Sequence, residues 1–405
     1  MVRLCLALIP LAFAVSLVAT RLIRGVSHRA GAHDTNAVPG QIKEAPRRVP
    51  NTGGIAIFLA IALPILALLA FLASGSVVPN DWNLVPTDLH EHIAGLKSKV
   101  ADAGLLLGAL LGIHLLGVID DRRPLGPVPK LLVTLLIAAV LVIVTNTRLL
   151  SLLDAHVGGP WLSIALTALW IGAITNALNF LDNMDGLAAT VALVASSLFL
   201  WAALAGQQWF VGACFALLTG ACGGFLVFNF PWTKRGASIF MGDGGSLVLG
   251  FLLAFLSVRL TYARIGDAAS SAWIGQPGSG GNAAWYGVLM PLAALAVPIY
   301  DMLAVSCIRL SQGRSPFVGD LNHLSHRLVR RGLSKRAAVI VIGCFTAITG
   351  LCGVLLLNAG PFQAGVIGAL VLLMMLTLAL IEFGGSAAAS GVLTPPTPAP
   401  PGSSA

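Results

Sequence analysis

Long, uncharged apolar runs are the feature of this sequence that most restricts how the chain can fold. A helix that crosses the hydrocarbon core of a bilayer needs about 20 apolar residues. Inside a bilayer the backbone has to satisfy its own hydrogen bonds, so such runs form helices rather than open sheets. Only 10% of the 405 residues are charged and 57% are hydrophobic, whereas about 25% charged residues is usual in a soluble domain. We therefore expect an all-α integral membrane protein.

The apolar runs predict about eleven transmembrane helices. They centre on Leu4–Thr20, Gly54–Leu72, Ala103–Ile119, Leu131–Thr145, Trp161–Leu178, Leu187–Ala205, Phe210–Phe228, Ser246–Val258, Trp285–Ile308, Ala337–Leu357 and Gln363–Phe383. The first run resembles a signal peptide, but Arg21 and Arg24 follow its apolar core and only Arg3 precedes it, which argues against one.

The distribution of basic residues predicts the orientation of these helices. Eleven spans place alternate connections on opposite faces, and 18 of the 24 Lys and Arg residues fall on one of them. By the positive-inside rule that face is cytoplasmic. The N-terminus is then outside, the C-terminus is cytoplasmic, and we expect the protein in the cell (inner or cytoplasmic) membrane.

The remaining composition fits one membrane domain. We expect residues 1–383 to form a polytopic transmembrane domain with functional cytoplasmic loops, followed by a Pro- and Ala-rich disordered tail at 384–405. The net charge of +8 comes from basic residues spread between apolar runs, so the prediction includes the lipid bilayer as a partner and no nucleic acid. The six cysteines form no CxxC pair, so we expect no zinc site and no disulfide framework.

Polar residues concentrate in four segments on the face predicted to be cytoplasmic. These are VIDDRRPLGPVPK at 118–130, NALNFLDNMDGLAAT at 176–190, NFPWTKRGASIFMGDGGS at 229–246 and GRSPFVGDLNHLSHRLVRRG at 313–332. Nothing in the hydropathy pattern requires this clustering.

In the second segment, Asn176, Asn179, Asp182 and Asp185 recur every three residues. In a continuing helix they fall near one face, and Gly186 then lets the chain leave helical geometry. Such a row suits a ligand with amide and hydroxyl edges, or a cation that prefers oxygen. The alternative is a turn in which Asn and Asp only cap helix ends.

The third segment places Asp243 between glycines at the mouth of a helix, with Ser246 following. Glycines allow the backbone to approach a phosphate at a helix N-terminus, and Mg²⁺ takes one or two carboxylates together with substrate phosphates. The alternative is that Asp243 and Ser246 only cap the helix.

Asp120 and Asp121 are adjacent carboxylates at the end of an apolar run. The pair repels itself unless a cation or a proton relieves it, which metal-dependent phosphoryl transfer requires. Lys130, at the start of the next helix, is a candidate phosphate anchor. The alternative is a solvated helix end in which Asp121 pairs with a neighbouring arginine.

In the fourth segment His323 and His326 are three residues apart and can share a helix face. We favour pyrophosphate contact over zinc, because no cysteine is near. A basic loop that only fixes topology is the alternative. Asp301 is a further acid inside an apolar run, which indicates a functional or structural polar contact inside the bundle.

Together these motifs resemble the polyprenyl-phosphate N-acetylhexosamine-1-phosphate transferases, glycosyltransferase family 4. The motifs follow in family order from about Arg47 to Leu328. They are PRRVPNTGGIAIF, the Asp120–Asp121 pair, Asn179-x-x-Asp-x-x-Asp-Gly186, FMGDGGS and SPFVGDLNHLSHRL. Asn183, Ser325 and the insertion WTKRGA, which lies between Asn229 and Phe240, depart from the family pattern.

The resemblance implies a Mg²⁺-dependent membrane transferase, with Mn²⁺ as an alternative ion. Its partners would be undecaprenyl phosphate and a UDP-sugar, with a homodimer as a further expected partner. The phosphate of the lipid would attack the β-phosphorus of the UDP-N-acetylhexosamine, which releases UMP and starts the synthesis of a cell-envelope polysaccharide.

The resemblance also implies a role for each site residue. Asp120, Asp121 and Asp243 would be catalytic, and Asp243 and Asp182 would hold the metal. Phe240 would stack on uracil, and Asn179, Asp182, Asp185 and Asn229 would line the nucleotide pocket. His323 and His326 would contact the pyrophosphate or the sugar, and Lys130 would bind phosphate.

The loop at 313–328 looks like that of the GlcNAc-type branch, so UDP-GlcNAc is the expected donor. Alternatives are the phospho-MurNAc-pentapeptide branch, whose PxHHH-type loop is absent, and a polytopic transporter, which would keep its polar groups near the bilayer midplane. A CDP-alcohol phosphotransferase would need Ala-Arg after Asp185-Gly186, and DGLAATVALVA lacks it.

Overall fold

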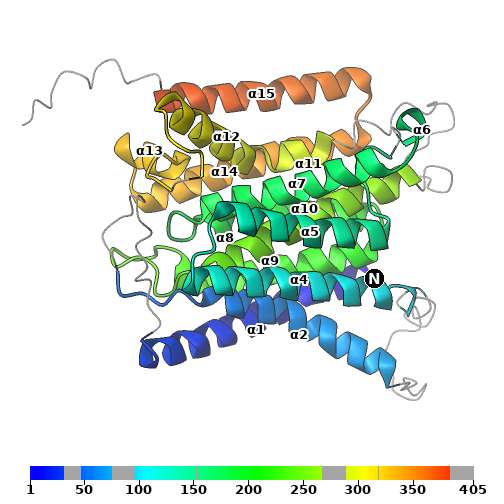
Figure 1. Cartoon of the computed structure of the whole chain (residues 1–405), viewed down its shortest axis with the longest axis horizontal. Helices are drawn as coiled ribbons and strands as arrows, with labels where there is room; N and C mark the ends of the chain where they lie inside the picture. Colours follow the sequence, from blue (N-terminus) through cyan, green and yellow to red (C-terminus); the bar gives the residue numbers. More distant parts are fainter. Residues whose placement is uncertain are drawn as a thin grey trace, which may run out of the picture.

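The computed structural model of the chain is a bundle of long helices (Figure 1). The structure describes residues 1–31, 47–74, 95, 97–151, 154–266, 289–317 and 319–383. The predicted disordered tail and most of the predicted non-cytoplasmic loops lie outside these residues. Among the described residues the long elements are helical, and the backbone forms one isolated parallel bridge, between Asn51 and Phe240.

Ten helices are long and apolar enough to span a membrane, which confirms ten of the eleven predicted spans and makes the chain a multi-pass membrane protein. They are α1 (Val2–Arg29), α2 (Gly53–Ala73), α4 (Val100–Arg122), α5 (Pro127–Thr145), α7 (Trp161–Leu181), α8 (Leu187–Ala205), α9 (Trp209–Asn229), α10 (Asp243–Gly266, counted as a span to Thr261), α14 (Lys335–Leu355) and α15 (Pro361–Phe383). The short elements are α6 (Asp154–Val157), α13 (Leu324–Arg330) and the 3₁₀ turn η3 (Leu356–Asn358).

The eleventh predicted span, Trp285–Ile308, is not one continuous helix in its described part, and its crossing of the membrane stays a prediction. In the described part of this stretch the chain forms two helices, α11 (Leu289–Ala294) and α12 (Ala296–Ser311), divided at Leu295. Pro298 is the physical reason, because it has no N–H to donate to the carbonyl of Ala294, four residues earlier, and its ring crowds that carbonyl.

Helix α10 is the central element of the bundle. In the 18-residue apolar stretch of α10 that could cross a membrane, 94% of the residues are buried, against 11% in the corresponding stretch of α15. Helix α10 packs against α2, α4, α7 and α8. Figure 1 shows α15 along one edge and α1 and α2 along the opposite edge, with α10 between them. The first residue of α10 is Asp243, so the best-buried helix carries a site candidate at its mouth.

The helices converge closely at the start of α10 because glycines face one another there. A Cβ on Gly54 would lie 2.2 Å from the backbone nitrogen of Gly245, and one on Gly117 would lie 2.4 Å from the carbonyl carbon of Asp243. The first N–H groups of α2 donate to the loop before α10, Gly53 to the Phe240 carbonyl (2.9 Å) and Gly54 to the Met241 carbonyl (2.8 Å). These bonds satisfy backbone donors that a helix N-terminus leaves open.

The absence of a side chain at Gly117 predicts a stability effect. Gly117→Ala should lower the thermal midpoint in detergent, since overpacking costs about 1–3 kcal/mol and the nearest atoms are backbone. Gly108→Ala is the matched control in the same helix, because a Cβ at Gly108 would meet nothing within 4 Å. Equal midpoints for the two variants would contradict the close packing of α4 on α10.

Candidate active site

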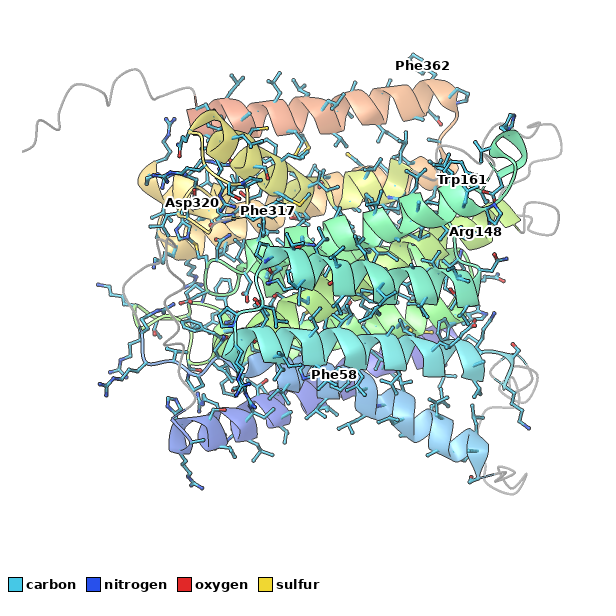
Figure 2. All side chains as sticks on the ribbon, viewed as in Figure 1. Phe58, Arg148, Trp161, Phe317, Asp320 and Phe362 are labelled. Carbon is cyan, nitrogen blue, oxygen red and sulfur yellow. The ribbon has the colours of Figure 1, made fainter. Side chains whose placement is uncertain are left out.

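The four polar segments meet at one end of the bundle, which we call the site end. It is formed by the last turn of α4, the first turns of α5 and α10, and the end of α7. Figure 2 shows Asp320 and Phe317 at this end and Arg148 and Trp161 at the opposite end.

Lys130, in the first turn of α5, joins three of these segments. Its ammonium Nζ donates to Asp120 Oδ2 (3.1 Å), to Asp243 Oδ2 (2.6 Å) and to Asn179 Oδ1 (3.4 Å). The side chains of Lys130 and Asp120 are each 14% exposed, so the pair is shielded while remaining reachable. A partly exposed cation held between two carboxylates is suited to receive a phosphate in place of one of them.

Asp243 is held on both oxygens. Oδ1 accepts a hydrogen bond from Asn179 Nδ2 (2.8 Å), which also donates to Ser246 Oγ (2.9 Å), and Oδ2 accepts from Lys130. The Asn179 and Asp243 predictions therefore converge on one contact, and the orientation of this carboxylate is fixed by its neighbours.

The adjacent acids Asp120 and Asp121 have different surroundings. Asp121 Oδ1 accepts from the backbone N–H of Asp243 (3.0 Å) and from Asn51 Nδ2 (3.1 Å), while Oδ2 accepts from the N–H of Gly244 (3.2 Å). Asp121 thus caps the N-terminus of α10 from another helix, where a negative charge is favourable. These contacts are with α10 and Asn51, whereas the alternative reading of the sequence paired Asp121 with a neighbouring arginine.

Asp120 lies on the other side of the α4 terminus, with Oδ1 accepting from the Leu125 N–H (2.8 Å) and Oδ2 accepting from Lys130. One acid of the pair orders the start of α10, and the other faces the cation.

Asp182 follows directly after α7 and is half-buried. Among the described residues its carboxylate has no hydrogen-bond partner, although its backbone N–H donates to the Asn179 carbonyl. Burial, followed by the charges of Asp243, Asp121 and Asp185, raises the pKa of Asp182 well above its usual value. The cluster therefore has an excess of negative charge that a cation or a proton would relieve.

Two of these carboxylates are suited to the predicted Mg²⁺. No three His, Cys, Asp or Glu side chains form a ready ligand group among the described residues. However, Mg²⁺ needs only one or two carboxylates when substrate phosphates complete its shell. Asp182 and Asp243 supply such oxygens in a region with uncompensated negative charge, so the residues fit the ion.

Asp185 and Phe240 meet at Arg47. The guanidinium donates to Asp185 Oδ2 (2.8 Å) and Oδ1 (2.5 Å) and lies 4.9 Å from the centroid of the Phe240 ring. Asp185 Oδ2 also accepts from the Ala237 N–H (2.9 Å). This contact brings both residues to the site end, with one face of the aromatic ring covered by Arg47.

Asn229, predicted to line the nucleotide pocket, contacts backbone groups of two loops. The side chain is buried, its Oδ1 accepts from the Gly186 N–H (2.9 Å), and its Nδ2 donates to the Ile239 carbonyl (2.9 Å). Both ends of the amide hold backbone, so Asn229 joins the turn before α8 to the loop before α10. Its contact with a nucleotide stays a prediction.

His323 lies in a second buried cluster beside the first. Its Nδ1 lies 2.8 Å from Asp301 Oδ2 and its Nε2 lies 3.4 Å from Arg309 Nη2. Since arginine can only donate, Nε2 is the acceptor in the contact with Arg309, and the Nδ1–H then donates to Asp301. Asp301, predicted as a polar contact inside the bundle, therefore orients His323.

Asp320 and His326 complete this cluster. Asp320 Oδ1 accepts from Arg309 Nη2 (3.0 Å). Burial alone would raise the pKa of Asp320, but hydrogen bonds from Arg309 and from Asn322 lower it below its usual value. His326 is buried in α13. Ser325, the residue before His326, donates to Asn183 Oδ1 (2.5 Å). This contact places α13 beside the turn that carries Asp182 and Asp185.

Several residues of the site end were not predicted from the sequence. Asn51 supports Asp121, Arg47 pairs with Asp185, and Arg309 joins His323 to Asp320. Arg309 directly follows the predicted run Trp285–Ile308, but its burial and its partners are set by the fold.

The proposed divalent site predicts a ligand effect on stability. Mg²⁺ at millimolar concentration should raise the thermal midpoint of the wild-type protein, because an ion that binds only the folded state stabilises it. In Asp182→Asn, at a carboxylate with no hydrogen bond to the other described residues, the increase should be much smaller. EDTA-treated protein is the reference, and Asp154→Asn at the opposite end is the control. An equal increase in Asp182→Asn and the wild type would contradict the assignment.

The sequence of this chain is similar to those of a known enzyme family. The sequence profile described as glycosyl transferase family 4 matches residues 103–261, which include Asp120, Asn179, Asp182 and Asp243. The chain is 30% identical over 404 residues to the "Decaprenyl-phosphate N-acetylglucosaminephosphotransferase" of Mycobacterium tuberculosis, covering 92% of this chain and 88% of that protein.

Two further relatives carry related names. The "Probable undecaprenyl-phosphate N-acetylglucosaminyl 1-phosphate transferase" of Bacillus subtilis is 27% identical over 363 residues, 89% of this chain and 86% of that protein. The "Undecaprenyl-phosphate alpha-N-acetylglucosaminyl 1-phosphate transferase" of Yersinia pestis is 26% identical over 328 residues, 78% of this chain and 75% of that protein.

Proposed function

Because the chain belongs to glycosyl transferase family 4, we propose that it transfers N-acetylglucosamine-1-phosphate from UDP-GlcNAc to undecaprenyl phosphate. The products are UMP and the lipid-linked pyrophosphoryl sugar. Family membership disfavours the transporter alternative. The observation that carries the proposal is the convergence of Asp120, Asn179 and Asp243 on Lys130, since it supplies a cation and oriented carboxylates for two phosphorylated substrates.

The reaction requires a phosphate oxygen of the lipid to attack the β-phosphorus of UDP-GlcNAc while the bond to the bridging oxygen of UMP breaks. Both substrates are anionic, so positive charge and hydrogen-bond donors have to be held ready at the site. Lys130 would supply the charge to the attacking phosphate by leaving Asp120. A Mg²⁺ held by Asp182 and Asp243 would neutralise charge on the diphosphate oxygens.

Asp120 is the acid of the adjacent pair that we assign to the lipid phosphate. It pairs with Lys130 through a single contact, which a phosphate can replace. Asp121 keeps both oxygens on the N-terminus of α10 and would act by holding Asp243 in place. The lipid phosphate lies at a membrane interface, which suits a site at the ends of the spans. The positive-inside count supports the cytoplasmic face, and the homodimer stays a prediction.

The first test is an assay of purified protein in detergent with UDP-GlcNAc, undecaprenyl phosphate and Mg²⁺. We expect release of UMP, and Asp243→Asn should reduce the rate at least about 100-fold, by analogy with the loss of a charge-stabilising group. Asp154→Asn, at the opposite end, is the control and should retain activity. Absence of UMP with every UDP-N-acetylhexosamine would rule out the proposed reaction.

A second test separates the adjacent acids. Asp120→Ala should lose activity with little change in the thermal midpoint. Asp121→Ala should lose activity and also unfold at lower temperature, because loss of a helix cap costs about 0.5–2 kcal/mol. Thermal unfolding and UMP release are measured on the same preparations. A larger loss of stability in Asp120→Ala than in Asp121→Ala would contradict this division of roles.

A further inference from the structure

Glu382, in the last turn of α15, is a buried carboxylate that receives side chains from two other elements. Its Oε2 accepts from Arg327 Nε (2.8 Å), lies 2.7 Å from Arg327 Nη2, and accepts from the Tyr300 hydroxyl (3.2 Å). Arg331 also donates to the main-chain carbonyl of Glu382. The end of α15 is therefore bound to α12 and to α13 by polar contacts.

The rest of α15 gives no reason for an acid at this position. Glu382 is the only charged residue among the 23 residues of the helix. In the apolar stretch of α15 that could cross a membrane, 11% of the residues are buried. An ionised group in a spanning helix is costly and usually marks a functional or structural contact. A buried ion pair adds little net stability compared with apolar packing. Its advantage is that it holds two elements in one defined arrangement.

The element held in this way is α13, which carries His326 and Arg327. At its N-terminus Asp301 accepts from the Leu324 N–H (2.6 Å) and from His323. In the middle of the helix Arg327 is held by the Glu382 carboxylate, and Arg331, directly after the helix, donates to the Glu382 main-chain carbonyl. Two carboxylates from two different helices thus hold the first residue and the middle residue of a seven-residue helix. The contact of Ser325 with Asn183 joins that helix to the turn bearing Asp182.

We propose that Glu382 is a positioning residue that acts through Arg327 to hold α13 against the site end, and so sets the affinity for the nucleotide-sugar substrate. The inference rests on the proposed function for the identity of that substrate. Glu382 does not contact the reacting atoms. Its removal should change how well the sugar diphosphate is bound rather than the chemistry at Lys130 and Asp243, which lie on other elements.

The primary test is Glu382→Gln, assayed by UMP release with each substrate varied in turn. We expect the KM for UDP-GlcNAc to rise about 10- to 100-fold, the loss associated with small misplacements of binding groups. The kcat and the KM for undecaprenyl phosphate should change less than about threefold, as expected when an interaction is shared by ground state and transition state. Unchanged KM for UDP-GlcNAc would overturn the proposal.

Hydrogen–deuterium exchange gives a readout that does not depend on the reaction. In Glu382→Gln the amides of residues 324–331 should exchange faster than in the wild type, while those of α10 should be unchanged. Unchanged exchange in α13 would overturn the proposal even if activity fell. If the wild type releases no UMP but this exchange pattern appears, the proposed function fails while the mechanical link between Glu382 and α13 stands.

Companion variants separate positioning from general damage. Glu382→Asp keeps the charge and should recover part of the KM loss. Arg327→Gln removes the same ion pair and also the hydrogen bond from Arg327 to the Asn322 carbonyl, so its KM loss should be at least as large. The double variant should be no worse than Arg327→Gln alone, because the effects of coupled residues are not additive. Thr377→Ala, elsewhere on α15, should match the wild type. Multiplicative losses in the double variant would show that Glu382 and Arg327 act independently and would overturn the proposal.

Discussion

The capping of α10 by Asp121 is the contact on which the site end depends. The start of α10 is packed against α2 and α4 with glycines at the closest approach, so water has little access to its first N–H groups. Such groups are costly when buried without a partner. Asp121 accepts two of them from another helix. This one carboxylate orders the backbone around Asp243 and holds α4 to the central helix, with the result that Asp120 is turned towards Lys130.

The adjacent acids Asp120 and Asp121 have different hydrogen-bond partners, which could not be predicted from the sequence. Two neighbouring residues on a helix point about 100° apart, so a pair at a helix end can serve two surroundings. Asp121 serves the fold and Asp120 serves the cation. Lys130 then connects α4, α7 and α10 through three polar contacts. The side chains that we propose to act in the reaction thus also form hydrogen bonds between helices. A phosphate bound to Lys130 would replace its bond to Asp120.

Much of the fold follows from the sequence, since hydropathy and length alone gave ten of the spans. The eleventh predicted span, Trp285–Ile308, is divided into two helices in its described part, and Pro298 is the residue in the sequence that indicates such a break. The site was predicted less completely. Residue type and spacing placed Asp120, Asn179 and Asp243 in one region, but the partner of a side chain depends on which helices are neighbours. For that reason the pairing of Asp185 with Arg47, of Asn229 with two backbone groups, and of His323 with Asp301 could not be predicted from the sequence. Glu382 was missed because its partners lie more than 50 residues away.

The central claim is that the convergence on Lys130 and Asp243 forms the place where the two phosphorylated substrates meet. The most direct measurement is an experimental structure of the protein with UDP-GlcNAc and Mg²⁺ bound. The account predicts diphosphate density between Lys130, Asp182 and Asp243, with the ion against Asp182 and Asp243. Nucleotide density away from these side chains, with Lys130 still bridging Asp120 and Asp243, would contradict it.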